Sequence, residues 1–291
     1  MKSYKEFIRE SKTDIHSICQ RHRITNYIIN SDGTIDVDGS VILNNNLTKL
    51  PLKFRNVTGS FDCSDNQLTT LKGAPESVGG EFNCSDNQLT TLKGAPQTVD
   101  GEFNCAGNQL NSLEGAPQTV GGDFYCSHNK LTKLEGAPQT VGGDFYCGGN
   151  QLTSLEGAPQ TVGRNFNCSN NKLTSLEGGP QSVGRDFRCS LNELTTLEGC
   201  PQSVGGDFYC RSNKLINFNG FPEDFEGNLY LDDNPLEEVY NLFRKVKCIK
   251  WLNEFDVIQG DKVILDRLEE VYHQMGMDIP DNIKLKNYEI I

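Results

Sequence analysis

Phe-Asp-Cys-Ser-Asp-Asn-Gln-Leu-Thr-Thr-Leu-Lys-Gly-Ala-Pro, residues 61–75, decides the fold because this pattern returns every 21 residues along a chain of 291. A cysteine marks each return without insertion or deletion, at Cys63, Cys84, Cys105, Cys126, Cys147, Cys168, Cys189 and Cys210. Weaker copies flank the run and place Ile42 and Leu231 in the cysteine position, which makes ten units. A fixed period of this size predicts a solenoid, in which each unit packs only on its neighbours.

Within one unit, Phe-x-Cys-x-x-Asn-x-Leu-x-x-Leu resembles the leucine-rich repeat, and the Pro-x-x-Val that follows is similar to the short bacterial type. The resemblance implies an α+β fold with one parallel sheet on a concave face. Alternation along a strand predicts that Phe82 and Cys84 point inward and Asn83 outward. The inward Asn of each unit is expected to hydrogen-bond backbone groups where the chain leaves the sheet. Gly-Gly and Pro in each unit leave little room for a helix, so the convex side is expected to be non-helical.

The two ends of the chain depart from the repeat and predict caps. Residues 1–40 are expected to form an N-terminal cap, with an amphipathic helix over 3–21 and a hairpin over 26–43. Residues 41–239 hold the ten-unit array. Residues 240–291 predict a small helical C-terminal cap, and the apolar tail 288–291 is expected to add to an edge or to dock on this cap.

The chain has 11 cysteines, but their positions argue against a disulfide framework. Eight of them share one position of the repeat, and the outlying units fill that position with aliphatic residues. Side chains in register on parallel strands lie about 4.8 Å apart and point the same way, which is poor geometry for a disulfide. No His or carboxylate shares the inward register, so no metal and no cofactor are expected. The thiols are predicted to be reduced core side chains.

Negative charge is concentrated on the array. The chain carries a net charge of −12, and residues 40–239 hold 13 basic and 24 acidic side chains, or −11. This balance disfavours nucleic acid and anionic membranes and favours a protein partner with a basic patch. No apolar run reaches the roughly 18 residues of a membrane span, and the charged N-terminus does not resemble a signal peptide, so a cytoplasmic location is expected.

Two outward rows of the sheet are the candidate binding surface. The residue three before each cysteine gives an acidic row, and the residue just before each cysteine changes from small and polar to Tyr and Arg in the second half of the array. Tyr and Arg are enriched in binding hot spots. The candidate partner-binding residues on the concave face are Tyr125, Tyr146, Arg188, Tyr209, Tyr230, Arg211, Asp123, Asp144, Asp186 and Asp207.

A plainer interpretation of both rows remains open. Repeats diverge after duplication, and Tyr has a good strand propensity. The acidic row is equally consistent with a solvated face. Catalysis finds no support, because the four His residues form no metal-protease motif and no Gly-x-Ser-x-Gly or phosphate-binding Gly-Lys-Ser/Thr is present. The ubiquitin-ligase domain that accompanies similar repeats in bacterial effectors does not fit into residues 240–291, so no enzyme is predicted.

The opening Lys-Ser-Tyr-Lys-Glu-Phe-Ile and the segment Asn-Pro-Leu-Glu-Glu-Val-Tyr-Asn-Leu-Phe, with the cysteine-type repeats between them, resemble leucine-rich repeat proteins of large tailed bacteriophages. This resemblance implies a setting, a phage product inside an infected bacterial cell, and no activity. The leading hypothesis is therefore a non-enzymatic inhibitor or adaptor that binds a host or defence protein and is itself a monomer. The alternatives are a virion or self-assembly component and a small-ligand or metal-binding sponge.

Overall fold

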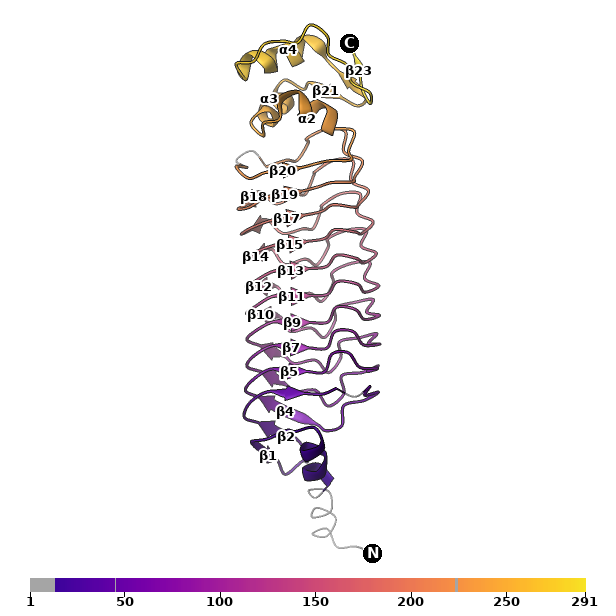
Figure 1. Cartoon of the computed structure of the whole chain (residues 1–291), viewed down its shortest axis with the longest axis vertical. Coiled ribbons are helices and arrows are strands. Elements are labelled where there is room, and N and C mark those ends of the chain that lie inside the picture. The colour runs from indigo at the N-terminus through magenta and orange to yellow at the C-terminus, as the bar shows by residue number, and fades with distance from the viewer. Residues whose placement is uncertain (1–13, 45, 223–224) are drawn as a thin grey trace, which may run out of the picture.

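The computed structural model describes residues 14–44, 46–222 and 225–291, and shows a long column of stacked coils (Figure 1). Each coil contributes one short strand to each of two parallel sheets. The column shows little curvature in this view, with a few helices at its C-terminal end. The architecture is a leucine-rich repeat solenoid with 21-residue units, as the sequence predicts.

The first sheet, which we call the phenylalanine sheet, contains the Phe-x-Cys segments. Its strands are β3 (Val41–Ile42), β5 (Phe61–Asp62), β7 (Phe82–Asn83), β9 (Phe103–Asn104), β11 (Phe124–Tyr125), β13 (Phe145–Tyr146), β15 (Phe166–Asn167), β17 (Phe187–Arg188), β19 (Phe208–Tyr209) and β20 (Leu229–Tyr230). All neighbours pair in parallel, with Phe beside Phe from one unit to the next. Phe82 and Cys84 are fully buried and Asn83 is half-buried, so the predicted facing is confirmed.

A second sheet runs along the return path, where only an extended or turn-like segment was expected. Its strands are β1 (Tyr27–Ile29), β2 (Ile35–Val37), β4 (Phe54–Val57), β6 (Ser77–Val78), β8 (Thr98–Val99), β10 (Thr119–Val120), β12 (Thr140–Val141), β14 (Thr161–Val162), β16 (Ser182–Val183) and β18 (Ser203–Val204). The valines point into the core, and the β-branched Thr-Val pairs suit extended backbone. The convex side is therefore non-helical.

The core between the sheets repeats every coil. The Phe, Cys and Leu positions are buried throughout the array, and the Phe rings stack on one another with centroids 5.2 to 5.8 Å apart between Phe61 and Phe208. All 11 cysteines are unpaired, and all but Cys200 are buried. The predicted role of the cysteines as small core side chains is confirmed.

A ladder of asparagines joins successive coils. The Asn87 side-chain amide donates to the carbonyl oxygens of Cys84 (3.2 Å) and of Cys63 in the preceding coil (2.9 Å). Its Oδ1 accepts from the N–H of Leu68 in that preceding coil at 2.9 Å. Each such amide satisfies backbone groups that would otherwise be buried without partners, at a cost of about 1–3 kcal/mol per group. The predicted function of the inward Asn is confirmed.

The first unit corrects one prediction. Ile42 is not in the cysteine position, because β3 pairs Ile42 with Asp62 and Val41 with Phe61. Ile42 is 62% exposed, and the next residue, Leu43, is 99% buried in the place of the cysteine. The unit is thus one residue shorter at this point than a strict 21-residue step from Cys63 assumes, and a shift of one residue on a strand reverses the facing of a side chain.

At the N-terminal end, the predicted hairpin is present, with β1 and β2 antiparallel and β2 leading into the second sheet. Residues 14–21 are helical, and the rest of the helix predicted over 3–21 lies outside the described residues. The hairpin therefore supplies the first strands of the column.

At the C-terminal end lie three helices, α2 (Glu237–Phe243), α3 (Cys248–Glu254) and α4 (Leu265–Gln274). A small sheet of β21 (Ile258–Gln259), β22 (Lys262–Val263) and β23 (Glu289–Ile290) accompanies them, and the tail joins its edge as predicted. Tyr288 Oη donates to the Ile216 carbonyl at 2.8 Å, which ties this end to the array. Among the described residues, no helix has both the length and the apolar character that crossing a bilayer requires.

Candidate protein-binding face

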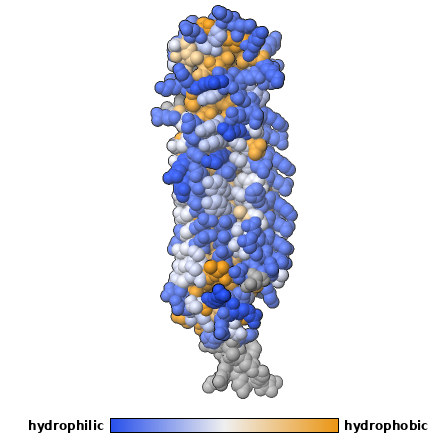
Figure 2. Space-filling view, viewed as in Figure 1, coloured by the Kyte–Doolittle hydropathy of each residue, from blue (hydrophilic) through white to orange (hydrophobic). Residues whose placement is uncertain are grey.

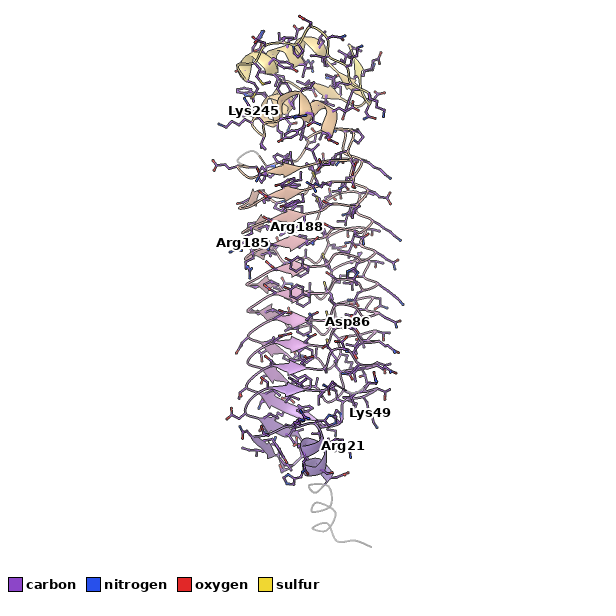
Figure 3. All side chains as sticks on the ribbon, viewed as in Figure 1. Arg21, Lys49, Asp86, Arg185, Arg188 and Lys245 are labelled. Carbon is purple, nitrogen blue, oxygen red and sulfur yellow. The ribbon has the colours of Figure 1, made fainter. Side chains whose placement is uncertain are left out.

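The ten candidate residues come together on the outward side of the phenylalanine sheet. We call this surface, from β11 to β20, the Tyr/Arg face. Its central line, the Tyr row, consists of Tyr125, Tyr146, Asn167, Arg188, Tyr209 and Tyr230. Figure 3 shows Arg188 on this ladder of strands. All six side chains are half-buried, because they lie along the sheet beside their neighbours rather than extending into solvent.

The aromatic rings of the Tyr row form two stacks. Tyr125 and Tyr146 are stacked with centroids 5.1 Å apart and planes at 7°, and Tyr209 and Tyr230 with centroids 4.5 Å apart and planes at 6°. Arg188 places its guanidinium carbon 4.6 Å from the centroid of Tyr209. Arg211, at the end of β19, lies 4.8 Å from the centroid of Tyr230. Cation–π contacts of this kind contribute about 0.5–1 kcal/mol at exposed sites.

The acidic row differs from the solvated face that was one interpretation of it. Asp123, Asp144 and Asp207 each accept a hydrogen bond from the hydroxyl of the Tyr two residues later, at 3.1, 3.1 and 3.3 Å. Their other carboxylate oxygens accept backbone N–H groups of the next coil, at 2.7 to 3.0 Å. Asp144 is only 6% exposed. These carboxylates therefore hold the coils together and fix the tyrosines.

The same ladder continues through a residue that sequence reasoning left outside the committed site. Asn165 takes the row position between Asp144 and Asp186, donates its amide to Asp144 at 2.9 Å and accepts from the Asp186 N–H at 3.1 Å. Its place in the acidic row was visible in the sequence, but an amide at that position gave no sign of a bridge.

The pKa shifts follow from this burial. Desolvation, and the hydrogen bond to Asp123, raise the pKa of Tyr125. Desolvation and the nearby Asp144 and Asp207 carboxylates raise the pKa values of Tyr146 and Tyr209 in the same way. The phenols are therefore neutral hydrogen-bond donors at physiological pH, and their donor protons are directed to the aspartates. The ring edges and phenol oxygens stay available to a partner.

The arginines of the face are paired with acids. Arg188 contacts Asp186 at 2.8 Å, and Arg211 contacts Asp232 at 2.6 Å. Desolvation by burial acts to raise the pKa of Asp186, but the hydrogen bond from Arg188 outweighs it, and the pKa is lowered. Arg188 Nε is buried with no hydrogen-bond partner among the described residues. Asp232, which follows β20, was not among the predicted site residues.

The neighbouring strands β7 and β9 carry acids without such cations. We call Glu81 and Glu102, with the small Asn83 and Asn104 beside them, the acidic half. Burial, and the adjacent Glu81 and Asp123 carboxylates, raise the pKa of Glu102 to about 7. A raised pKa at a partly buried carboxylate shows that negative charge here lacks compensation, so a cation from outside would be favoured.

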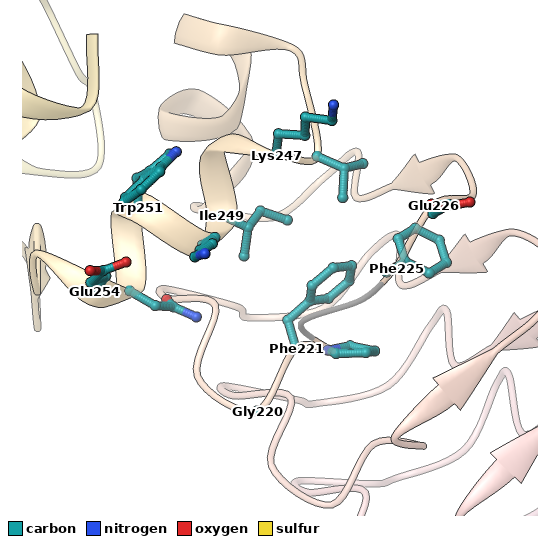
Figure 4. A pocket seen from close by; sticks show the side chains of 12 residues that line it. Gly220, Phe221, Phe225, Glu226, Lys247, Ile249, Trp251 and Glu254 are labelled. Carbon is teal, nitrogen blue, oxygen red and sulfur yellow. The ribbon is translucent and has the colours of Figure 1, made fainter. Parts of the chain in front are cut away.

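A separate hollow of about 890 Å³ lies between the last coil and helix α3 (Figure 4). Phe221, Phe225 and Ile249 form its apolar wall, with Lys247 and Glu254 at the rim. It is remote in sequence from the Tyr row, and its lining among the described residues includes no histidine or cysteine. In the described part of the chain, no group of three or more His, Cys, Asp or Glu side chains is placed to hold a metal ion.

The geometry defines a leucine-rich repeat solenoid with a preformed aromatic and charged face. No family model matches the chain, and no curated protein matches it. Among solved structures, YopM from Yersinia enterocolitica WA-314 is similar, with 20% identity over 67% of this chain and a TM-score of 0.32. The match covers 56% of the YopM chain, so this chain spans little more than half of that length.

Proposed function

We propose that this chain is a non-enzymatic protein-binding solenoid that holds a basic protein through the Tyr/Arg face and the acidic half. The observation that carries the proposal is the pair of Tyr stacks, locked by the aspartate ladder. Side chains already fixed in place lose little conformational entropy when a partner binds, which favours affinity. Tyr and Arg side chains that keep polar edges are also the types that dominate binding energy in interfaces.

Charge complementarity indicates the kind of partner. The arginines of the face are already paired, whereas Glu81 and Glu102 have no printed ion pair, and the array carries −11. Figure 2 shows that this side of the column is mostly hydrophilic, with apolar surface gathered near the two ends. A basic, partly aromatic protein surface fits such a face. Its association is expected to weaken as salt screens the charges.

The narrower role in this proposal is that of an inhibitor or adaptor acting on a bacterial host or defence protein in the cytoplasm. It depends on the resemblance to phage proteins described above, and the three domain boundaries at residues 40 and 239 belong to the same proposal. Support from the structure is limited to a binding face.

The test compares three immobilised proteins in bacterial lysate. One is the wild type, one carries Tyr125→Ala, Tyr146→Ala and Tyr209→Ala, and the matched control carries Ala at Thr119, Thr140 and Thr161, which are exposed or border solvent on the opposite sheet. We expect a protein that the wild type and the control capture and the tyrosine variant does not. Equal capture by all three would move the binding site away from the Tyr/Arg face.

Self-assembly is the second candidate, because large apolar side chains are exposed near the ends of the column. Ile28 and Ile42 are 69% and 62% exposed at one end, and Ile291 is 53% exposed at the other. Light scattering of the purified protein separates the two functions. A monomer at micromolar concentration supports the binding protein, and a concentration-dependent increase in mass supports assembly.

A further inference from the structure

The Tyr row has one interruption, at Asn167 on β15. On one side of it, the Tyr125–Tyr146 stack ends with Tyr146. On the other side, Arg188 begins the group that continues through Tyr209. Among the described residues, no ring or cation contact joins Tyr146 to Arg188 across this position. One ring face of Tyr146 therefore lacks a stacking partner.

The interruption is the width of one planar group. Neighbouring parallel strands are about 4.8 Å apart, so two residues separated by two strands frame a gap of about 9.6 Å. A ring placed midway would lie about 4.8 Å from each wall. That spacing is close to the 5.1 Å between Tyr125 and Tyr146.

The floor of this gap is small and polar. Asn167 Oδ1 accepts from the Ser169 N–H at 2.9 Å, which turns the amide toward its own strand end. The residue in the adjacent outward position of the preceding coil is Gly148, where most other coils carry Ser. No large side chain of the described residues at these row positions fills the space.

The two walls select the occupant. A guanidinium or ammonium group would be repelled by Arg188, and a carboxylate would be repelled by Asp144 and Asp186. An aromatic ring avoids both, because it stacks on the free face of Tyr146 and presents its electron-rich face to the Arg188 cation. We propose that the Asn167 gap is a slot that receives one aromatic side chain of the basic partner. This inference rests on the proposed function.

The slot also sets the spacing that a partner must satisfy. Glu102 on β9 is three strands from Asn167 on β15, which is about 14 Å along the column. An extended peptide covers this distance in about four residues, at about 3.3 Å per residue. The partner segment is expected to carry Lys or Arg about four residues from its aromatic residue and to run along the column, across the strands.

Two synthetic peptides probe the slot without knowledge of the natural partner. Both alternate lysine and threonine over about nine residues, long enough for about 30 Å in extended form. One has tryptophan at its centre, and the other has leucine. For the wild type we expect the tryptophan peptide to bind about tenfold more tightly by fluorescence anisotropy, which equals about 1.4 kcal/mol.

Two tyrosine insertions at equivalent row positions give a matched pair. Asn167→Tyr fills the slot and is expected to reduce the preference to about one, whereas Asn104→Tyr lengthens the row beyond Tyr125 and is expected to leave it near tenfold. Tyr146→Ala removes one wall without adding bulk and is expected to lower the preference as well. Circular dichroism confirms that each variant is folded.

Several results would overturn the slot. They are equal affinity of the two peptides for the wild type, no binding of either peptide at millimolar concentration, an unchanged preference in Asn167→Tyr, or the same loss in Asn104→Tyr. The proposed function is judged separately by lysate capture with the triple tyrosine variant, so the slot can fail while that function stands.

Discussion

Asp144 Oδ1 accepts the backbone N–H of Asn165 at 2.9 Å, so a carboxylate on the outward side of one coil holds the start of the next strand. Its Oδ2 accepts the Tyr146 hydroxyl at 3.1 Å. A single side chain thereby joins two coils and fixes one ring of the Tyr row. Stability and binding geometry depend on the same groups here.

Asp144→Ala should destabilise the array because it leaves the Asn165 N–H and the Tyr146 hydroxyl without their acceptor. Hydrogen bonds to charged groups contribute about 1.5–3 kcal/mol each, so we expect a loss of about 2–3 kcal/mol in the free energy of unfolding. Asp144→Asn keeps one carbonyl acceptor and should lose less. Urea denaturation measures both, with Asp100→Ala, at an exposed side chain, as the control. Equal midpoints for Asp144→Ala and wild type would contradict the ladder.

Glu102 should make stability fall as pH rises toward neutrality. Its pKa is raised from 4.5 to about 7 in the folded chain, so between these values the folded state binds a proton that the unfolded state has lost. The penalty of the ionised form is therefore absent below about pH 4.5 and complete above about pH 7. Glu102→Gln removes it, and its stability gain over wild type should grow from pH 5 to pH 8 in thermal melts.

The matched control for this pH series is Glu114→Gln, at an exposed carboxylate outside the acidic row. A gain for Glu102→Gln that does not change with pH would show that packing, and not charge, distinguishes the variant. Binding of a basic partner should also release protons near pH 7, because a nearby cation lowers the pKa of this carboxyl group.

The cysteine ladder should resist thiol reagents in the native state. The thiolate is the reactive form, and burial raises the pKa values of Cys84 and Cys126 well above the usual range. Cys200 alone is not fully buried, and burial raises its pKa to about 12. At pH 8 we expect Cys200 to react first with an aromatic disulfide reagent and the ladder thiols to react only at the rate of unfolding. Fast labelling of several thiols would reverse the assigned facing of the strands.

The sequence predicts the phenylalanine sheet well because Phe, Cys and Asn recur without a gap, so alternation can be tested in every unit. It misses the second sheet because Thr-Val is only two residues long and shows no period of its own. It misplaces Ile42 because the step of 21 residues shortens by one there, and Leu43 takes the core position.

For the candidate site, the two rows follow from the sequence, but the contacts within them do not. A carboxylate at the start of a short strand has the same pattern whether it faces water or bonds the next coil. Asp144 is buried because the N–H of Asn165 and the hydroxyl of Tyr146 converge on it, which depends on the stacking of coils in space. The gap at Asn167 likewise requires the ring positions.

Leu191 offers a stabilising change in the array. It has a left-handed backbone with φ of 58° and is 55% exposed, so it carries the steric cost of that conformation without burying its side chain. The same position in other coils holds residues suited to it, such as Gly149 and Asn170. The left-handed conformation costs an ordinary residue about 1–2 kcal/mol, and Asn tolerates it better.

Leu191→Asn should therefore raise the free energy of unfolding by about 1 kcal/mol, measured by urea denaturation. Leu191→Ala is the control, because it removes the exposed apolar surface but keeps a Cβ in the left-handed conformation. We expect the alanine variant to stay near wild type. If alanine stabilises as much as asparagine, the gain comes from the loss of exposed leucine, and the backbone of this turn is not strained.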